Sequence, residues 1–297
     1  MDLDVACHLN VVVPDLAGAS SDGVLDALAR AGYRRVVLPP FDPSAEDLPR
    51  LRALFADHGL VPIPIAGQWP GADVSSPDAS EAAAGEAALR SMVDATAALG
   101  GDQLNGVPYA SFGAAGPSSR EAFERAARAV GRVADHAHDR GVTMTFEVLN
   151  RYETPVLNTA AQAMAFVESS GSEHLRIHLD AYHMAVEEAD PSEAIRLALP
   201  RLAFLELGQS GRGPLSRGSV DVASLVRQAL DDGYTGRWGV EAFSRSVLAE
   251  PVADMLSIWR GTYDDGIALA DDAMRVIRSG WSSSAPGRRA HRLARTE

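Results

Sequence analysis

Residues 140–147 read RGVTMTFE, and they contain the pattern from which the fold can be inferred. A glycine follows a helical stretch, and a run of apolar and β-branched residues then leads to a carboxylate, Glu147. The same order recurs in AGYRRVVL (31–38), HGLVPIPI (58–65), LGGDQLNG (99–106) and DGYTGRWGVE (232–241). Because glycine adopts a positive φ without strain, it is typical of the position just past a helix end. Each copy therefore predicts a helix-to-strand junction.

Eight apolar runs alternate with eight helical stretches along the whole chain. The runs cover residues 5–13, 35–38, 61–65, 103–106, 143–147, 175–180, 202–206 and 238–241. The helical stretches cover about 22–29, 46–58, 79–99, 119–139, 159–170, 191–199, 220–232 and 247–278. Strict alternation predicts an α/β fold, a single (β/α)8 TIM barrel. A doubly wound open sheet is the alternative, but the count reaches eight and no glycine-rich nucleotide loop follows the first run.

No linker divides the chain, so we expect one domain over residues 1–279. Residues 280–297 read GWSSSAPGRRAHRLARTE and are rich in Ser, Pro, Gly and Arg. This composition predicts a disordered C-terminal tail.

Composition excludes several functional classes. The 297 residues carry a net charge of −13, and all 27 basic residues are arginine. The lack of lysine rules out Schiff-base, Walker-A and pyridoxal phosphate chemistry, and the negative charge argues against nucleic-acid binding. Cys7 is the single cysteine, which excludes an internal disulfide and a cysteine zinc cluster. With no membrane-length apolar run and no basic leader, we expect a cytoplasmic protein without a membrane partner.

Carboxylates stand at or near the ends of four consecutive predicted strands: Glu147, Asp180, Glu206 and Glu241. Active sites of such barrels lie at the carboxyl ends of the strands, so these groups should converge. Close carboxylates repel one another, and a divalent cation relieves the repulsion; an all-oxygen set suits Mn²⁺ or Mg²⁺ better than zinc. Salt bridges to arginine are the alternative, and at the seventh strand either Glu206 or Gln209 could be the inward group.

Four further residues are candidates for substrate contact. His183 follows the sixth strand in a predicted loop, and His8 lies inside the first strand. Arg212 lies in the glycine-rich stretch 209–218, which is typical of a lid or an anion clamp. Trp69, after the third strand, could form an apolar wall against a sugar ring. Each also has an ordinary explanation as a core or surface residue.

Three segments carry a resemblance to a known family. They are FEVLNRYETPVLNTAAQAMAFV (146–167), HLDAYHMAVEE (178–188) and VEAF (240–243). The chain resembles the D-tagatose 3-epimerase and L-ribulose 3-epimerase group of the xylose-isomerase-like sugar isomerases and epimerases. The similarity runs from about Val5 to Ile277 and is sharpest over residues 146–243.

The resemblance implies an Mn²⁺-type ion (Mn²⁺, or Mg²⁺ or Co²⁺) held by Glu, Asp, His and Glu at the ends of strands five to eight. By motif position, Glu147 and Glu241 would be metal ligands and the acid/base pair, and Asp180 a third ligand. Substrate contacts would fall on Glu153, His183 and Arg212. Members of the group often form dimers, so a homodimer is a candidate assembly.

The seventh strand departs from the group. The group has His-x-Gly-Glu where this chain has Glu206-Leu207-Gly208-Gln209. The replacement adds negative charge and keeps a hard ligand, so Glu206 is expected to take the fourth ligand position. It also leaves the group's usual substrate in doubt.

The expected activity is epimerisation or isomerisation of a ketose or keto-sugar derivative. A proton would be removed next to a carbonyl, through a metal-stabilised enediolate. One alternative is a metal-dependent lyase acting on a 3-keto sugar, of the C-glycoside deglycosidase or keto-inositol dehydratase type. Another is a degenerate, non-catalytic barrel. A metal-dependent abasic-site nuclease is disfavoured by the negative charge.

Overall fold

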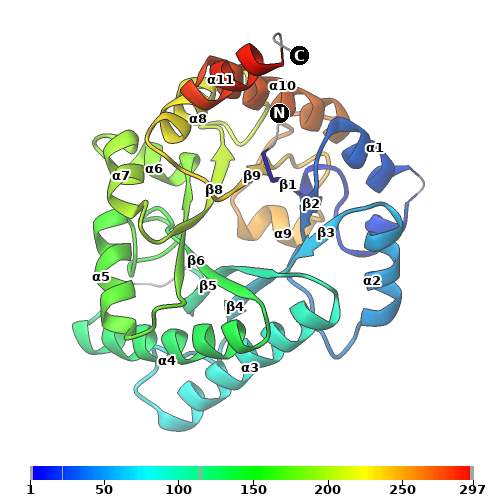
Figure 1. Cartoon of the computed structure of the whole chain (residues 1–297). Helices are drawn as coiled ribbons and strands as arrows, with labels where there is room; N and C mark the ends of the chain where they lie inside the picture. Colours follow the sequence, from blue (N-terminus) through cyan, green and yellow to red (C-terminus); the bar gives the residue numbers. More distant parts are fainter. Residues whose placement is uncertain (1–2, 22, 114–115, 295–297) are drawn as a thin grey trace.

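The protein is a ring of parallel strands surrounded by helices (Figure 1). The structure is a computed structural model, and it describes residues 3–21, 23–113 and 116–294. The strands are β1 (Val5–His8), β2 (Arg35–Val37), β3 (Val61–Ile63), β4 (Ile65–Gln68), β5 (Gln103–Ser111), β6 (Thr143–Glu147), β7 (Arg176–Asp180), β8 (Leu202–Gly208) and β9 (Arg237–Glu241). Each of the eight predicted runs contains strand, which confirms the predicted barrel.

The ring closes through a proline. The run predicted over residues 61–65 is divided at Pro64 into β3, which pairs with β2, and β4, which pairs with β5. Proline has no N–H to donate to a neighbouring strand, so the pairing is interrupted at Pro64 and the run forms two short strands. Between β4 and β5, Gly106 has φ +118°, and a Cβ there would collide with the Ala66 backbone. Only glycine fits this close approach.

Helices cover the outside of the ring. They are α1 (Val24–Ala31), α2 (Leu48–Asp57), α3 (Ala79–Ala98), α4 (Arg120–Asp139), α5 (Ala160–Ser170), α6 (Ala181–Glu187), α7 (Pro191–Ala198), α8 (Val222–Asp231), α9 (Glu250–Met255), α10 (Gly266–Ser283) and α11 (Ala285–Leu293), with short 3-10 turns η1 (Leu9–Val11) and η2 (Ala17–Ser20). The stretch predicted as one helix over 247–278 forms α9 and α10 with an irregular connection. The short helix α6 lies where the sequence predicted a loop.

The C-terminal segment differs from the expected disorder. α10 extends to Ser283 and α11 follows, so residues through Leu293 are helical; residues 295–297 lie outside the described part of the chain. Ser284 accepts a hydrogen bond from the backbone N–H of Gly287 and caps α11, while Trp281 contacts His291. Packing against α8 and α10 thus orders a polar helix that composition alone describes as disordered.

The register of the parallel strands sets the position of each strand end along the barrel axis. Asp180 pairs with Glu206, Glu147 with His178, and Gly208 with Glu241. The ends of β6 to β9 therefore lie close to one level at one mouth of the barrel. No helix in the described part of the chain is long and apolar enough to cross a membrane.

Candidate active site

The four carboxylates predicted to converge lie in one buried cluster. Glu147, Asp180 and Glu241 end their strands, and Glu206 lies two residues before the end of β8. Three overlapping groups of side chains have ligand atoms close enough to hold one ion: Glu147–Asp180–His183, Glu147–His178–Glu206, and His8–Glu206–Glu241. Shared members link the groups, so the cluster is continuous.

Asp180 is held in place through one of its two carboxylate oxygens. Its Oδ1 accepts hydrogen bonds from the backbone N–H groups of Tyr182 (2.9 Å), where it caps α6, and Gly208 (3.2 Å). A Cβ at Gly208 would lie 2.8 Å from that oxygen, so glycine makes room for the carboxylate. The other oxygen, Oδ2, faces Arg212 and His183. This is the geometry of a carboxylate poised to bind a cation through a single oxygen.

His183 lies on α6 rather than in the predicted loop. Its Nδ1 accepts hydrogen bonds from the backbone N–H (3.0 Å) and the side-chain amide (2.9 Å) of Asn150. A ring nitrogen that accepts an N–H bond carries no proton, so the proton lies on Nε2. Nε2 lies 3.5 Å from Glu147 Oε1 and 3.6 Å from Asp180 Oδ2. His183 is therefore a hydrogen-bond donor into the cluster.

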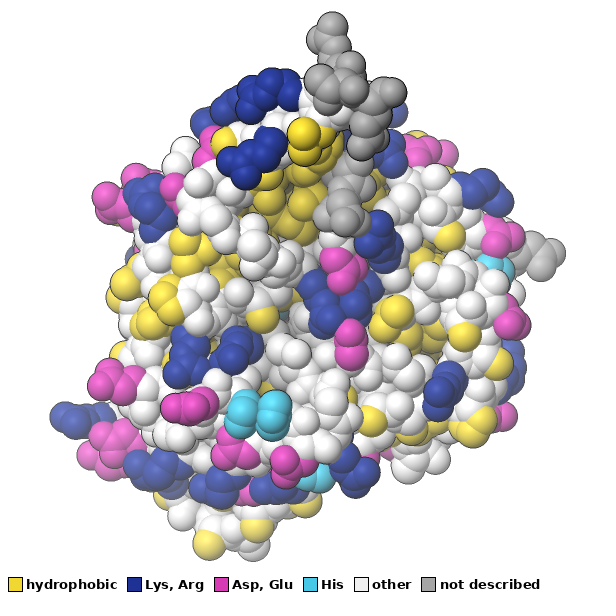
Figure 2. All heavy atoms as spheres, in the orientation of Figure 1, with side chains coloured by type: hydrophobic (Ala, Val, Ile, Leu, Met, Phe, Trp, Pro, Cys, Tyr) yellow, Lys and Arg dark blue, Asp and Glu magenta, His cyan; other side chains and the backbone are white. Residues whose placement is uncertain are grey.

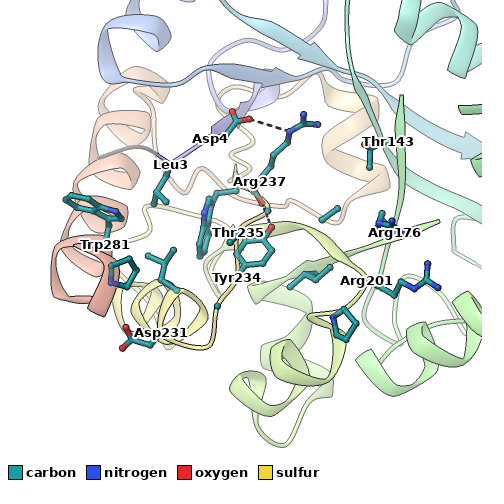
Figure 3. Close-up of a pocket in the computed structure, with 18 of the residues that line it drawn as sticks. Leu3, Asp4, Thr143, Arg176, Arg201, Asp231, Tyr234, Thr235, Arg237 and Trp281 are labelled. Atoms are coloured by element: carbon teal, nitrogen blue, oxygen red, sulfur yellow. Dashed lines mark hydrogen bonds and ion pairs between the residues drawn. The ribbon is translucent and has the colours of Figure 1, made fainter. Parts of the chain in front are cut away.

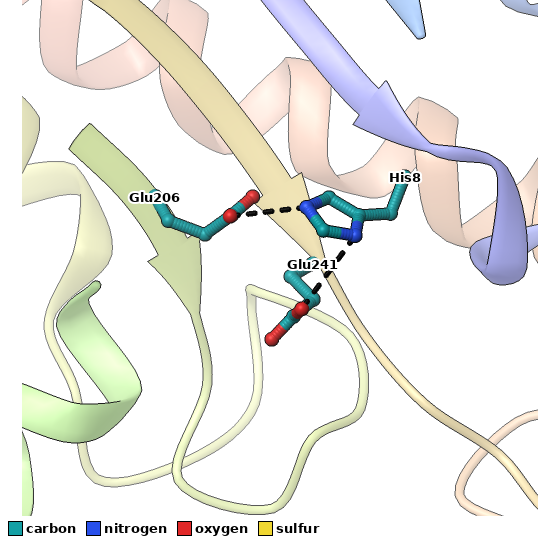
Figure 4. A group of neighbouring side chains, drawn as sticks. All are labelled: His8, Glu206 and Glu241. Carbon is teal, nitrogen blue, oxygen red and sulfur yellow. Dashed lines mark hydrogen bonds and ion pairs between the residues drawn. The ribbon is translucent and has the colours of Figure 1, made fainter. Parts of the chain in front are cut away.

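Glu206 is fully buried and lies between two histidines. Its Oε2 is 3.0 Å from His8 Nε2 and 3.1 Å from His178 Nε2, and His8 Nδ1 is 3.5 Å from Glu241 Oε1. Figure 4 shows the His8 ring standing between Glu206 and Glu241. Burial alone would raise the pKa of Glu206, but the charge of His8 and the hydrogen bonds of both histidines hold it well below its usual range.

The structure settles the choice at the seventh strand in favour of Glu206 as the inward group. Gln209 instead bonds within the following loop, where its amide contacts Leu215, Val220 and Ser210. His8 reaches the cluster as a partner of Glu206. His178 was missed by the sequence analysis; its position two residues before Asp180 on one strand was the available signal, because alternate residues share a face.

The two carboxylates at the edges of the cluster differ in acidity. Burial, with the charges of Glu206 and Glu147, raises the pKa of Glu241 to about 7 against the attraction of Arg212 and His8. Burial would also raise the pKa of Glu147, but the charge of His178 and the hydrogen bond of His183 lower it overall. Divergent environments of this kind are typical of an acid/base pair.

Arg212 enters the cluster from the β8–α8 loop. Its φ of 54° is left-handed, and its backbone is fixed by bonds of 2.7 Å to Gln209 O and from Phe243 N. The guanidinium lies 3.6 Å from the centre of the Tyr182 ring. Its Nη1 donates to Glu241 Oε2 and lies 3.4 Å from Asp180 Oδ2. A cationic nitrogen thus stands between two of the predicted metal ligands.

These residues fit a divalent cation. The donor set is carboxylate oxygen with imidazole nearby, which suits Mn²⁺-type ions. The Arg212 nitrogen acts as a stand-in cation between Asp180 and Glu241. Glu206 Oε1 also has no hydrogen-bond partner among the described residues, so the cluster offers a buried acceptor oxygen that a cation could occupy.

A cavity of about 360 Å³ adjoins the cluster through Arg212, which lines the cavity and also contacts Glu241 and Asp180. Glu153, Arg212 and Tyr182 line its polar side. Glu153 accepts a 2.9 Å hydrogen bond from Asn150 and lies 3.9 Å from Arg212 Nη2 and from His183 Nε2. The predicted substrate residues Glu153, His183 and Arg212 thus lie together beside the carboxylates.

Trp69 is not brought to this cavity. It follows β4, is 54% exposed, and lines a different depression with Pro40, Phe41 and Met92. Its role against a sugar ring therefore stays a prediction.

Comparison with known proteins places this geometry in a family. The model of the xylose isomerase-like TIM barrel matches residues 25–279. The chain belongs to that family. It is 39% identical to a ketose 3-epimerase of Arthrobacter globiformis over 84% of this chain and 86% of the relative. It is 36% identical to an L-ribulose 3-epimerase of Mesorhizobium japonicum over 93% of both chains.

A solved structure agrees with this placement in the xylose isomerase-like family. The D-allulose 3-epimerase of Methylomonas sp., in complex with D-allulose, superposes with a TM-score of 0.89 at 33% identity, covering 94% of this chain and 97% of that one. These relatives confirm the predicted resemblance and class: the chain is an isomerase-type enzyme.

Proposed function

We propose that this chain is a divalent-cation-dependent epimerase of a ketose or keto-sugar derivative, acting next to the carbonyl. The observation that carries the proposal is the position of Glu147 and Glu241 on β6 and β9. Two strands separate β6 from β9, so the two carboxylates approach the cluster from different sides. One can remove a proton from a carbon and the other can return a proton to its opposite face, which inverts that carbon.

A bound Mn²⁺-type ion would be held by Glu147, Asp180, Glu241 and Glu206, and it would supply Lewis-acid stabilisation of charge on substrate oxygens. Glu241 would accept the proton from the substrate and return it. Glu147 takes the complementary role. Asp180 keeps a fixed orientation through its two backbone hydrogen bonds and needs no proton transfer.

Recognition of the sugar is assigned to polar groups where the cavity meets the cluster. His183 presents an Nε2–H donor, Glu153 an acceptor, and Arg212 a donor, all buried or partly buried beside the cluster. Sugar hydroxyl groups both donate and accept, so this mixed set can bind two or three of them. The Methylomonas relative, whose structure holds D-allulose, supports a ketose as the ligand.

A lyase acting on a larger keto sugar is the second candidate, and a specific feature favours it. The cavity also borders an apolar rim in which Tyr152 is 82% and Trp259 67% exposed. Such a rim could hold an aglycone while the same carboxylates remove a proton and drive elimination.

Proton exchange tests the proposal directly. The metal-loaded enzyme is incubated in D₂O with D-allulose, L-ribulose and a 3-keto glycoside, and the products are followed by NMR. Deuterium at the carbon beside the carbonyl of a ketose, with inversion, is the expected result. Release of the aglycone from the keto glycoside without exchange into ketoses would favour the lyase. No exchange and no release with any metal tested would contradict both.

A further inference from the structure

A second cavity lies at the opposite mouth of the barrel. It has a volume of about 880 Å³ and is formed by the starts of β7, β8 and β9 with α10 and α11. Arg176 opens β7 and Asp180 ends it, so the cavity lies on the order of 13 Å along the strand from the carboxylate cluster. It is therefore separate from the proposed active site. Its volume is in the range of small-molecule sites.

Two arginines are held side by side in this cavity. Arg176 and Arg201 each donate an Nη1 hydrogen bond to one oxygen, the backbone carbonyl of Glu173, at 2.6 Å and 2.7 Å. Neither guanidinium has a carboxylate partner among the described residues. Burial, together with the charge of Arg201, lowers the pKa of Arg176. A guanidinium carries five N–H donors, so most donors of this pair remain free to bind an anion.

The acidic residues of the cavity are already paired elsewhere. Asp4 pairs with Arg35 and Arg237, and Asp231 pairs with Arg227 and accepts a hydrogen bond from the backbone N–H of Ala285. Arg289, on α11, adds a third cation to the lining without an ion pair in the described residues. The cavity is thus locally cationic in a chain with a net charge of −13.

The far side of the cavity is apolar and aromatic. Figure 3 shows Arg176 and Arg201 on one side and Trp281 and Leu3 on the other, with Tyr234 and Arg237 between them. Figure 2 shows a hollow floored by apolar side chains below the arginine-bearing edge of the molecule. A cationic end and an apolar end fit a ligand that has a charged head and an organic body.

We propose that this cavity binds a small organic oxyanion, with Arg176 and Arg201 clasping its charged head and Trp281 contacting its body. Both a phosphate monoester and a carboxylate have the fork of oxygens that paired guanidinium groups recognise. A ligand here would bind without competing with the sugar, because the two sites open at opposite mouths of the barrel.

Calorimetric titration of the full-length protein tests this proposal with three probes: inorganic phosphate, phenyl phosphate and benzoate. We expect saturable binding of at least one probe, with phenyl phosphate tighter than inorganic phosphate. The double variant R176Q/R201Q should weaken that binding about tenfold or more. The matched control is R30Q/R120Q, which removes the same number of charges from exposed positions on α1 and α4 and should bind as the wild type does.

A separate control distinguishes this site from the active site: E241Q should bind the anions normally even if it loses all exchange activity. Circular dichroism and proton exchange check that R176Q/R201Q is folded; if it is not, the single variant R201Q is used, with an expected loss of about threefold or more. Equal binding by the wild type and the arginine variants would overturn the proposal. An absence of saturable binding for all three probes would also overturn it.

Discussion

The guanidinium Nη1 of Arg212 donates directly to Glu241 Oε2, and the same nitrogen lies 3.4 Å from Asp180 Oδ2. Arg212 is buried, so its charge acts in a region of low dielectric. The nitrogen stands where the donor oxygens of two predicted metal ligands meet. Before a divalent ion can bind both carboxylates, this side chain has to move, and the move breaks its contacts with Glu241 and Asp180.

Replacing Arg212 by methionine should therefore have opposite effects on the two forms of the protein. The metal-free form loses the partner of two buried carboxylates, which should lower its melting temperature by roughly 5–10 °C. Affinity for Mn²⁺ should rise about tenfold, because a competing cation is gone. Calorimetry and thermal unfolding with and without Mn²⁺ measure both effects. Arg217→Met, an exposed change in the same loop, is the control. Weaker Mn²⁺ binding by the Arg212 variant would contradict the view that the ion has to displace Arg212.

Glu241→Gln should abolish proton exchange while keeping the fold. The amide cannot accept the substrate proton, and general acid/base groups contribute about 10²–10⁴-fold to the rate. The loss is measured as deuterium incorporation per enzyme in D₂O, and Glu147→Gln should behave similarly. Exposed Glu121→Gln serves as the matched control. Exchange at near wild-type rates in the Glu241 variant would remove this residue from the mechanism.

Glu206→Gln should change how the melting temperature of the metal-free protein depends on pH. Burial alone would lower the pKa of His8, but the charges of Glu206 and Glu241 raise it to about 9. A raised pKa means that the ion pair contributes its full stability below the unfolded value of about 6.5 and loses it as the pH rises through 9. The wild type should unfold roughly 5 °C above the variant at pH 6, and this gap should narrow towards pH 9. A gap independent of pH would show that His8 is neutral throughout.

Asp102→Asn should lower the melting temperature of the protein at neutral pH, and this effect should disappear in acid. Asp102 lies at the mouth of the barrel opposite the carboxylate cluster. Asp102 lies 2.5 Å from Arg35 and 2.6 Å from Arg237. Burial would raise the pKa of Asp102, but the hydrogen bond of Arg35 and the charge of Arg237 lower it. A lowered pKa means that the stability is present above the unfolded value of about 4 and is lost as the pH falls below it. Because Asp102 is partly exposed, we expect a difference of about 2–4 °C at pH 7 that disappears near pH 3.

Removal of metal should stop exchange reversibly. Dialysis against a chelator should reduce deuterium incorporation to background without unfolding the chain, because Arg212 still neutralises part of the cluster. Added Mn²⁺ should restore the rate, and Mg²⁺ or Co²⁺ is expected to do so partially. Full activity in protein shown by elemental analysis to be metal-free would contradict the proposed role of the ion.

Much of the fold follows from the sequence because its signals are local. The glycine-to-strand repeat locates the helix ends and strand starts, and alternation of eight units specifies the barrel. Once the barrel is inferred, residues that end strands must face one mouth. Glu147, Asp180 and Glu241 could therefore be placed together before any coordinates were known. The helix α6 and the ordered α11 depend on packing with distant segments, and the local pattern does not carry them.

The tertiary structure alone decides the interior of the site. Glu206 lies between His8 and His178 because the register of β8 against β7 and the closure of the ring at β1 bring three distant strands within hydrogen-bond reach. Arg212 reaches Glu241 because a left-handed turn fixes the loop backbone above the cluster. Such contacts join residues separated by up to about 200 positions in the chain, and no local pattern of residue types encodes their geometry. Periodicity in the sequence therefore locates the mouth of the barrel, and three-dimensional packing selects the partners of each charge.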